Sequence, residues 1–157
     1  MPNGNPNFHK EELPLLEAFF ARISPVLNSF ALDHNLFKEK YYHEGPSWSF
    51  QFKNQKGGIG QIEVEKKDDD KIILRNCWWI DDYDTSTRFL KYPSGKEVGL
   101  DHQELHQALE NALTEILQWD KNELIPIKTP HPWSKRCSKE QFYKQYEYIP
   151  DLRLIIS

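Results

Sequence analysis

Two histidines, His102 and His106, have the spacing that best suits a metal ion in this 157-residue chain. Four residues apart on a helix, their rings share one face, and a carboxylate such as Asp101 can join them in a transition-metal site. The run 101–106 does not match His-Glu-x-x-His, so the general base of a metalloprotease is misplaced and no third ligand is indicated. The sequence therefore predicts no metal site, and a metal-dependent enzyme remains the weakest hypothesis.

Acid–base chemistry has no support from a local motif either. Asp33 and His34 are adjacent and can form a dyad, and His43 or His102 beside a carboxylate is the alternative. No serine lies in a Gly-x-Ser-x-Gly elbow, and neither cysteine has the surroundings of a nucleophile. We therefore predict no catalytic residue and no cofactor.

Two short motifs are turns rather than ligand sites. The carboxylates at positions 81, 82 and 84 resemble hard-cation ligands, but the run lacks the glycine and the distal glutamate of a calcium loop. The glycines of 57–60 are not followed by the helix that a phosphate-binding loop requires. We expect a solvated turn and a hairpin.

Aromatic residues are the unusual feature, at 13% of the chain. Large rings fill a core, but rings on one sheet face with arginines nearby can also line a concave ligand site. The tentative ligand or partner site consists of Trp48, Phe50, Phe52, Arg75, Trp78, Trp79 and Arg88. A further aromatic run, 142–148, suits a protein interface because tyrosine, tryptophan and arginine anchor interfaces.

Two helices must position these residues. Between 11 and 32, apolar residues recur at steps of three and four, which predicts a helix with one buried face. Pro25 predicts either a kink or two helices, 11–23 and 25–33. Asp101 and Glu104 suit a capping box at the start of a second helix, about 102–119.

Between the helices, the hydrophobic period changes to two, which predicts about five short strands. Their short connections require an antiparallel sheet, because parallel neighbours need long crossovers. The strands are expected at 40–43, 47–54, 59–65, 71–80 and 85–92. The strand 71–80 is apolar at both parities, so both of its faces should be covered.

The chain is expected to form one α+β domain over 9–157, after a flexible lead-in at 1–8. Residues 120–157 are predicted to form a Pro-rich extension, an extended strap plus a short helix from Ser138 to about Tyr146, and 152–156 suits a last strand. Pro93-Ser94-Gly95 is expected to be a turn.

Charge and composition limit the partners. A formal net charge of −4 argues against nucleic acid, and no apolar run long enough to cross a bilayer argues against a membrane. The six basic and three acidic residues of 128–157 suit either contact with the acidic body or an acidic partner. Two cysteines far apart and no apparent secretory signal favour free thiols and a cytoplasmic location.

In its order of elements, the chain over about 11–119 is similar to small acidic binding proteins such as secretion chaperones and toxin-neutralising immunity proteins. The missing catalytic motifs, the acidic body and the surplus of aromatic residues favour a non-enzymatic module that binds another protein, or a copy of itself. The alternative is a small-molecule pocket, or an enzyme built on the aromatic sheet face.

Overall fold

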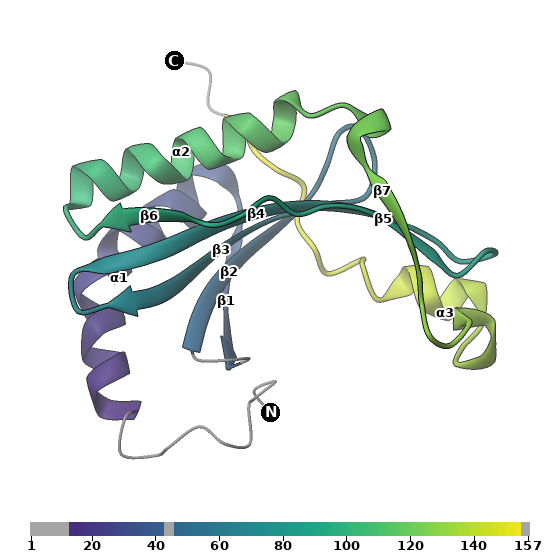
Figure 1. Ribbon diagram of the computed structural model, residues 1–157, viewed down its shortest axis with the longest axis horizontal. Coiled ribbons are helices and arrows are strands. Elements are labelled where there is room, and N and C mark those ends of the chain that lie inside the picture. The colour runs from purple at the N-terminus through teal and green to yellow at the C-terminus, as the bar shows by residue number, and fades with distance from the viewer. Residues whose placement is uncertain (1–12, 43–45, 155–157) are drawn as a thin grey trace.

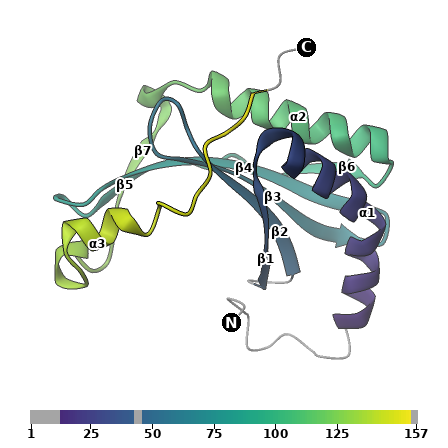
Figure 2. The ribbon, with the colours of Figure 1, turned by 180° about the vertical axis from the view of Figure 1, so that it is seen from behind.

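The computed structural model describes residues 13–42 and 46–154, which form the predicted α+β fold (Figure 1). The expectations for 1–8 and for His43 lie outside these residues. The first helix, α1 (Leu13–His34), continues through Pro25, and its axis changes direction between its two halves (Figure 2). The kinked helix is therefore confirmed over the alternative of two helices.

A single antiparallel sheet follows α1. It has seven strands in the order β1-β2-β3-β4-β5-β7, with β6 also paired to β4. The count exceeds the predicted five because two short strands, β6 and β7, were not expected. The strands are β1 (Phe37–Tyr42), β2 (Pro46–Lys53), β3 (Ile59–Asp68), β4 (Lys71–Asp82), β5 (Thr87–Lys91), β6 (Lys96–Gly99) and β7 (Ile125–Lys128).

The run Pro93-Ser94-Gly95 is not the turn that the sequence suggested. β5 pairs with one half of β4, at 78–82, and β6 pairs with the other half, at 71–74. Both lie antiparallel to β4 and their registers differ by one residue, so the chain continues along the same edge through a bulge. Pro93 is tolerated there because a bulged residue needs no ladder hydrogen bond.

Strand β7 lies at the edge of the sheet, and this position allows part of the proline-rich extension to form a strand. The amide of Thr129 donates to the carbonyl of Ser86 at 3.0 Å, which fixes the alternation of β7 against β5. By that alternation Pro126, which has no amide hydrogen, faces away from β5. Proline therefore removes an outward donor and leaves a poor edge for pairing with another strand.

The second long helix, α2 (His102–Gln118), begins at the predicted cap. The side chain of Asp101 accepts a hydrogen bond from the amide of Glu104 at 3.0 Å. The Glu104 carboxylate accepts from the amide of Gly99 rather than completing the box. This second contact joins the helix to β6.

Both long helices cover the same face of the sheet and enclose the main core. The buried residues of this face alternate along the strands, as in Phe50, Ile62, Ile72 and Trp78, and contact the apolar side of both helices. The opposite face meets the C-terminal segments, including η3 (Trp133–Lys135) and α3 (Lys139–Lys144), below the sheet in Figure 1. The prediction that β4 is covered on both faces holds for its middle, 76–79, whereas at 71–75 only the helix side is fully buried.

Aromatic side chains attach the C-terminal region to the sheet. Tyr83, Trp133 and Phe142 form a separate buried cluster, and Ser138 caps α3 as expected. The last predicted strand, 152–156, is not found in its described part, because 152–154 are not in a strand, and 155–157 lie outside the described residues. Asp151, just before it, forms a single bridge with Lys53.

One described helix, Pro14–His34, is long and apolar enough to cross a membrane when judged by length and composition alone. In this structure its buried side packs on the sheet, with Ile23, Leu27 and Phe30 fully buried. A core helix passes the same criterion, so this finding is weak evidence for a membrane span.

Candidate binding surface

The seven predicted site residues do not share one surface. Trp48, Phe50, Phe52 and Trp78 lie on the face beneath α1 and α2, whereas Arg75, Trp79 and Arg88 lie on the opposite face. Neighbouring residues of a strand point to opposite sides, so Trp78 and Trp79 are necessarily separated.

The helix-covered rings offer no surface to a ligand. Phe50, Phe52 and Trp78 are 0% exposed, and the indole of Trp78 donates to the carbonyl of Gly57 at 2.7 Å. Trp48 is half-buried against Phe20, with the ammonium of Lys38 4.5 Å from its ring centroid. The helices fill the space in which a concave aromatic site was expected.

The opposite face carries a row of half-buried polar side chains, and we call this row the polar face: Gln51, Gln61, Glu63, Glu65 and Arg75. Gln51 donates to Gln61 at 2.7 Å across the β2–β3 pair. Arg75 forms ion pairs with Glu65 and, at 3.5 Å, with Glu63. These contacts hold the row in register across three strands.

Three polar atoms on this side of the sheet are buried without a hydrogen bond to any described residue. They are the hydroxyl oxygen of Ser49, a residue that is 0% exposed, the amide oxygen of Gln51 and the indole nitrogen of Trp79. A buried polar atom that lacks a partner costs about 1–3 kcal/mol. Tyr92 borders the row and is 50% exposed: partial burial, and next the nearby charge of Glu63, raise its pKa.

Further along β4, the same face is occupied by a charged cluster under α3. The guanidinium of Arg88 contacts both carboxylate oxygens of Asp81, at 2.7 and 3.0 Å, and lies 5.1 Å from the ring centroid of Trp79. The hydroxyl of Tyr146 donates to the same carboxylate. Asp81 is thus fully engaged, and its side chain is only 3% exposed.

These surroundings raise the pKa values of Tyr146 and Cys77. Burial, with the hydrogen bond to Asp81 as a second cause, raises the pKa of Tyr146 above its ordinary value. Burial raises the pKa of the Cys77 thiol to about 12. Cys77 and Cys137 are both free, as predicted, and the thiol of Cys77 is therefore a poor nucleophile near neutral pH.

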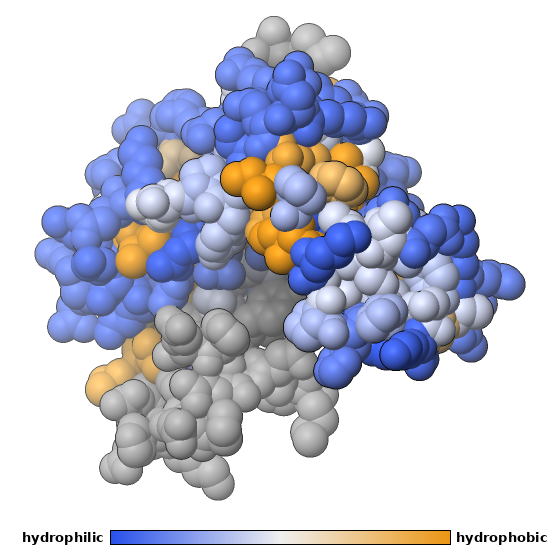
Figure 3. Space-filling model, turned by 45° about the vertical axis from the view of Figure 1, so that its right-hand side comes forward, coloured by the Kyte–Doolittle hydropathy of each residue, from blue (hydrophilic) through white to orange (hydrophobic). Residues whose placement is uncertain are grey.

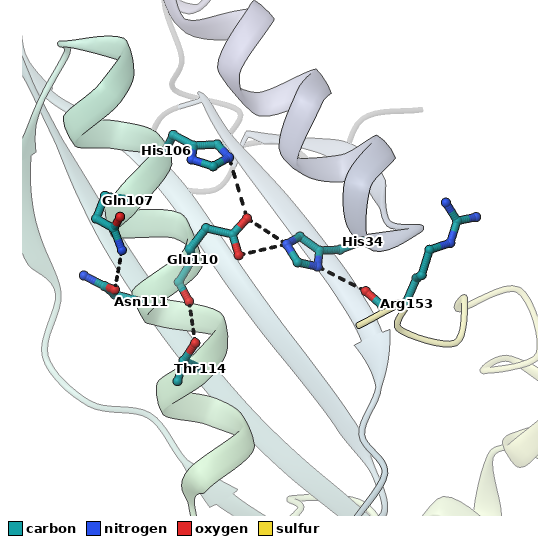
Figure 4. A network of polar contacts seen from close by, with 7 residues as sticks. All are labelled: His34, His106, Gln107, Glu110, Asn111, Thr114 and Arg153. Atoms are coloured by element: carbon teal, nitrogen blue, oxygen red, sulfur yellow. Dashed lines mark hydrogen bonds and ion pairs between the residues drawn. The ribbon is translucent and has the colours of Figure 1, made fainter. Parts of the chain in front are cut away.

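His34 is committed to structural contacts rather than to the dyad with Asp33 (Figure 4). Its Nε2 lies 2.7 and 2.9 Å from the carboxylate oxygens of Glu110, and its Nδ1 lies 3.1 Å from the carbonyl oxygen of Arg153. Because a carbonyl only accepts, Nδ1 must donate. Neither ring nitrogen is left for proton transfer to a substrate.

The two helical histidines are likewise used elsewhere. Nε2 of His102 lies 2.8 Å from the carbonyl oxygen of Arg22, and Nε2 of His106 lies 3.7 Å from Glu110. Within residues 13–42 and 46–154, no group of three or more histidine, cysteine or carboxylate side chains is placed to hold a metal ion.

The carboxylates predicted to lie in a solvated turn have varied surroundings. Asp81 is buried in the cluster with Arg88, whereas Asp84 is exposed and forms an ion pair with Lys139 at 2.9 Å. Asp82 accepts a hydrogen bond from the amide of Asp84 at 3.1 Å. The ion pair therefore attaches the turn to α3, and the three carboxylates have separate surroundings instead of sharing one site.

A surface cavity of about 370 Å³ lies away from the polar face, between the β2–β3 hairpin and the end of α2. Its lining is Gln55, Lys56, Asp120 and Lys121, and Lys56 donates to the carbonyl of Trp119 at the helix end. Figure 3 shows that one side of the molecule is mostly hydrophilic, with a hydrophobic patch near its centre.

No protein-family model, curated protein or solved structure matches the chain.

Proposed function

We propose that the chain is a non-enzymatic protein-binding module and that its polar face meets the partner. The single observation that carries this proposal is a fixed row of half-buried polar side chains, bordered by the exposed ring of Tyr92, on the sheet face that neither long helix covers. Tyrosine and arginine are enriched where protein interfaces gain most of their binding energy.

The unpartnered atoms of Ser49 and Gln51 are buried beneath this face and closed to a partner, so the proposal rests on the half-buried row and on Tyr92. Contacts to the main chain and to Glu110 engage the rings of His34 and His102, so these two side chains lend no support to acid–base chemistry.

The test is the affinity of a partner isolated from the native lysate, measured with purified components. We expect Tyr92→Ala to weaken binding about tenfold, because a truncated hot-spot side chain costs more than about 1 kcal/mol. Leu32→Ala, on the exposed side of α1, is the control and should leave the affinity unchanged. Equal affinities for wild type and Tyr92→Ala would reject the polar face as the interface.

A further inference from the structure

The last described residues of the chain cross the edge of the sheet. We call 149–154 the terminal segment. β1 covers β2 only as far as the pair Phe37 and Gln51, so the end of β2 at Lys53 is free of β1. The terminal segment takes that place through a parallel bridge between Lys53 and Asp151. Figure 2 shows it passing from α3 to the region where α1 and α2 meet.

Hydrogen bonds hold the terminal segment by its main-chain atoms. The amide of Lys53 donates to the carbonyl of Pro150 at 3.0 Å, and the amide side chain of Asn35 donates to the carbonyl of Asp151 at 3.0 Å. At Arg153, the amide donates to the carbonyl of His34 at 2.9 Å, and the carbonyl accepts from the His34 ring at 3.1 Å.

Two side chains anchor the terminal segment. Ile149 is 2% exposed and packs against Ile59, Cys77 and Trp79 on one side of the sheet, whereas Leu152 packs on the main core. The side chains of Asp151 and Arg153 are exposed. Main-chain pairing with alternate side-chain pockets is how proteins recognise extended peptides added to a sheet edge.

We propose that the slot formed by Lys53, His34 and Asn35 binds an extended segment of a partner protein, which displaces the terminal segment. The partner segment has aliphatic residues three positions apart, like Ile149 and Leu152. Main-chain recognition does not distinguish the chain's own segment from a foreign one with this spacing. The inference rests on the proposed protein-binding function and specifies the kind of partner.

The terminal segment competes with any such partner because it is tethered. A short tether gives an effective concentration in the millimolar range, so a foreign peptide binds wild type weakly until the tethered segment is disabled. The appropriate protein is therefore the full chain with Ile149→Asp and Leu152→Asp, which keeps the slot and removes both anchors.

The probe is a fluorescent peptide with the sequence of residues 146–154, and binding is measured by anisotropy. We expect the double variant to bind it at least about tenfold more tightly than wild type does. A peptide carrying the same two aspartates is the control and should bind neither protein. A folded double variant that does not bind the native peptide overturns the inference.

A second measurement keeps the proposal testable if the double variant fails to fold. Hydrogen exchange is followed in the wild-type chain with and without excess unlabelled peptide. We expect the native peptide, and not the aspartate peptide, to accelerate exchange of the Arg153 amide, because displacement breaks its bond to His34. The peptide is added well above the millimolar effective concentration of the tethered segment, and unchanged exchange at that concentration overturns the inference.

The slot proposal and the polar-face proposal can be rejected independently of each other. If the peptide does not bind the slot while Tyr92→Ala still weakens binding of the partner, the slot is rejected and the protein-binding function stands. If Tyr92→Ala has no effect while the peptide binds the slot, the polar face is rejected and the slot becomes the interface.

Discussion

His34 and Glu110 lie 76 residues apart in sequence, yet Nε2 of the histidine contacts both carboxylate oxygens, at 2.7 and 2.9 Å. Nδ1 of the same ring lies 3.1 Å from the carbonyl oxygen of Arg153. This one side chain joins the end of α1, the middle of α2 and the terminal segment. His34 is therefore expected to be central to how these three parts are held together.

Replacing His34 with alanine should lower the free energy of unfolding by about 1–3 kcal/mol, because buried hydrogen-bonding groups lose their partner. Urea denaturation measures the change. The matched control is His106→Ala, whose ring is 3.7 Å from the same carboxylate and half-exposed; its effect should stay within about 0.5 kcal/mol. Equal effects from the two variants would contradict the role assigned to His34.

The burial of the predicted aromatic site has its own test. Phe50→Ala should destabilise the protein by about 3–5 kcal/mol, since removing a fully buried ring leaves a cavity under both helices. Phe37→Ala, at a ring that is 57% exposed, should change stability by no more than about 0.5 kcal/mol. A small effect at Phe50 would mean that this face is open.

Stability should fall as the pH rises from about 9 towards 12. Burial raises the folded pKa of Cys77 from its ordinary 9.0 to about 12, so in this range the unfolded chain loses a proton that the folded chain keeps. The contribution is fully present below pH 9 and can fall by up to about 1.4 kcal/mol per pH unit. The raised pKa of Tyr146 acts in the same direction at higher pH.

Cys77→Ala should reduce this dependence, whereas Cys137→Ala should preserve it. The measurement is urea denaturation at several values of pH for both variants and wild type. An unchanged slope in Cys77→Ala would show that the thiol is not the group responsible.

Substitution by alanine should destabilise the protein to different extents at the two glycines of the β2–β3 hairpin. A Cβ added at Gly58 would lie 2.1 Å from the carbonyl oxygen of Trp79, while one at Gly57 would meet only flexible or distant atoms at 3.5 Å or more. Both residues have positive φ, so both alanine variants lose about 1–2 kcal/mol. Thermal unfolding should therefore place Gly58→Ala clearly below Gly57→Ala, and the reverse order would contradict the hairpin geometry.

The elements were largely predictable because they depend on local periodicity. The steps of three and four before Leu32, and the cap at Asp101, define the two long helices without any tertiary contact. β6 was missed because Pro93 and Gly95 are typical of turns, whereas only pairing with β4 shows that the strand resumes beyond them.

The site was less predictable because it depends on register and on distant contacts. The spacing of Phe50 and Phe52 places them on one face, but it does not tell whether Trp78 or Trp79 joins them. That depends on the pairing of Gly60 with both Phe52 and Trp78. The partner of His34 comes from a helix far away in the sequence, and no local pattern indicates it.

The most direct test of the protein-binding account is photocrosslinking in native lysate, with benzoylphenylalanine in place of Tyr92 or, as the control, in place of the exposed Gln103 of α2. We predict one discrete adduct from position 92 that excess unlabelled wild-type chain competes away, and none from position 103. No adduct from position 92, or the same adducts from both positions, would contradict the account.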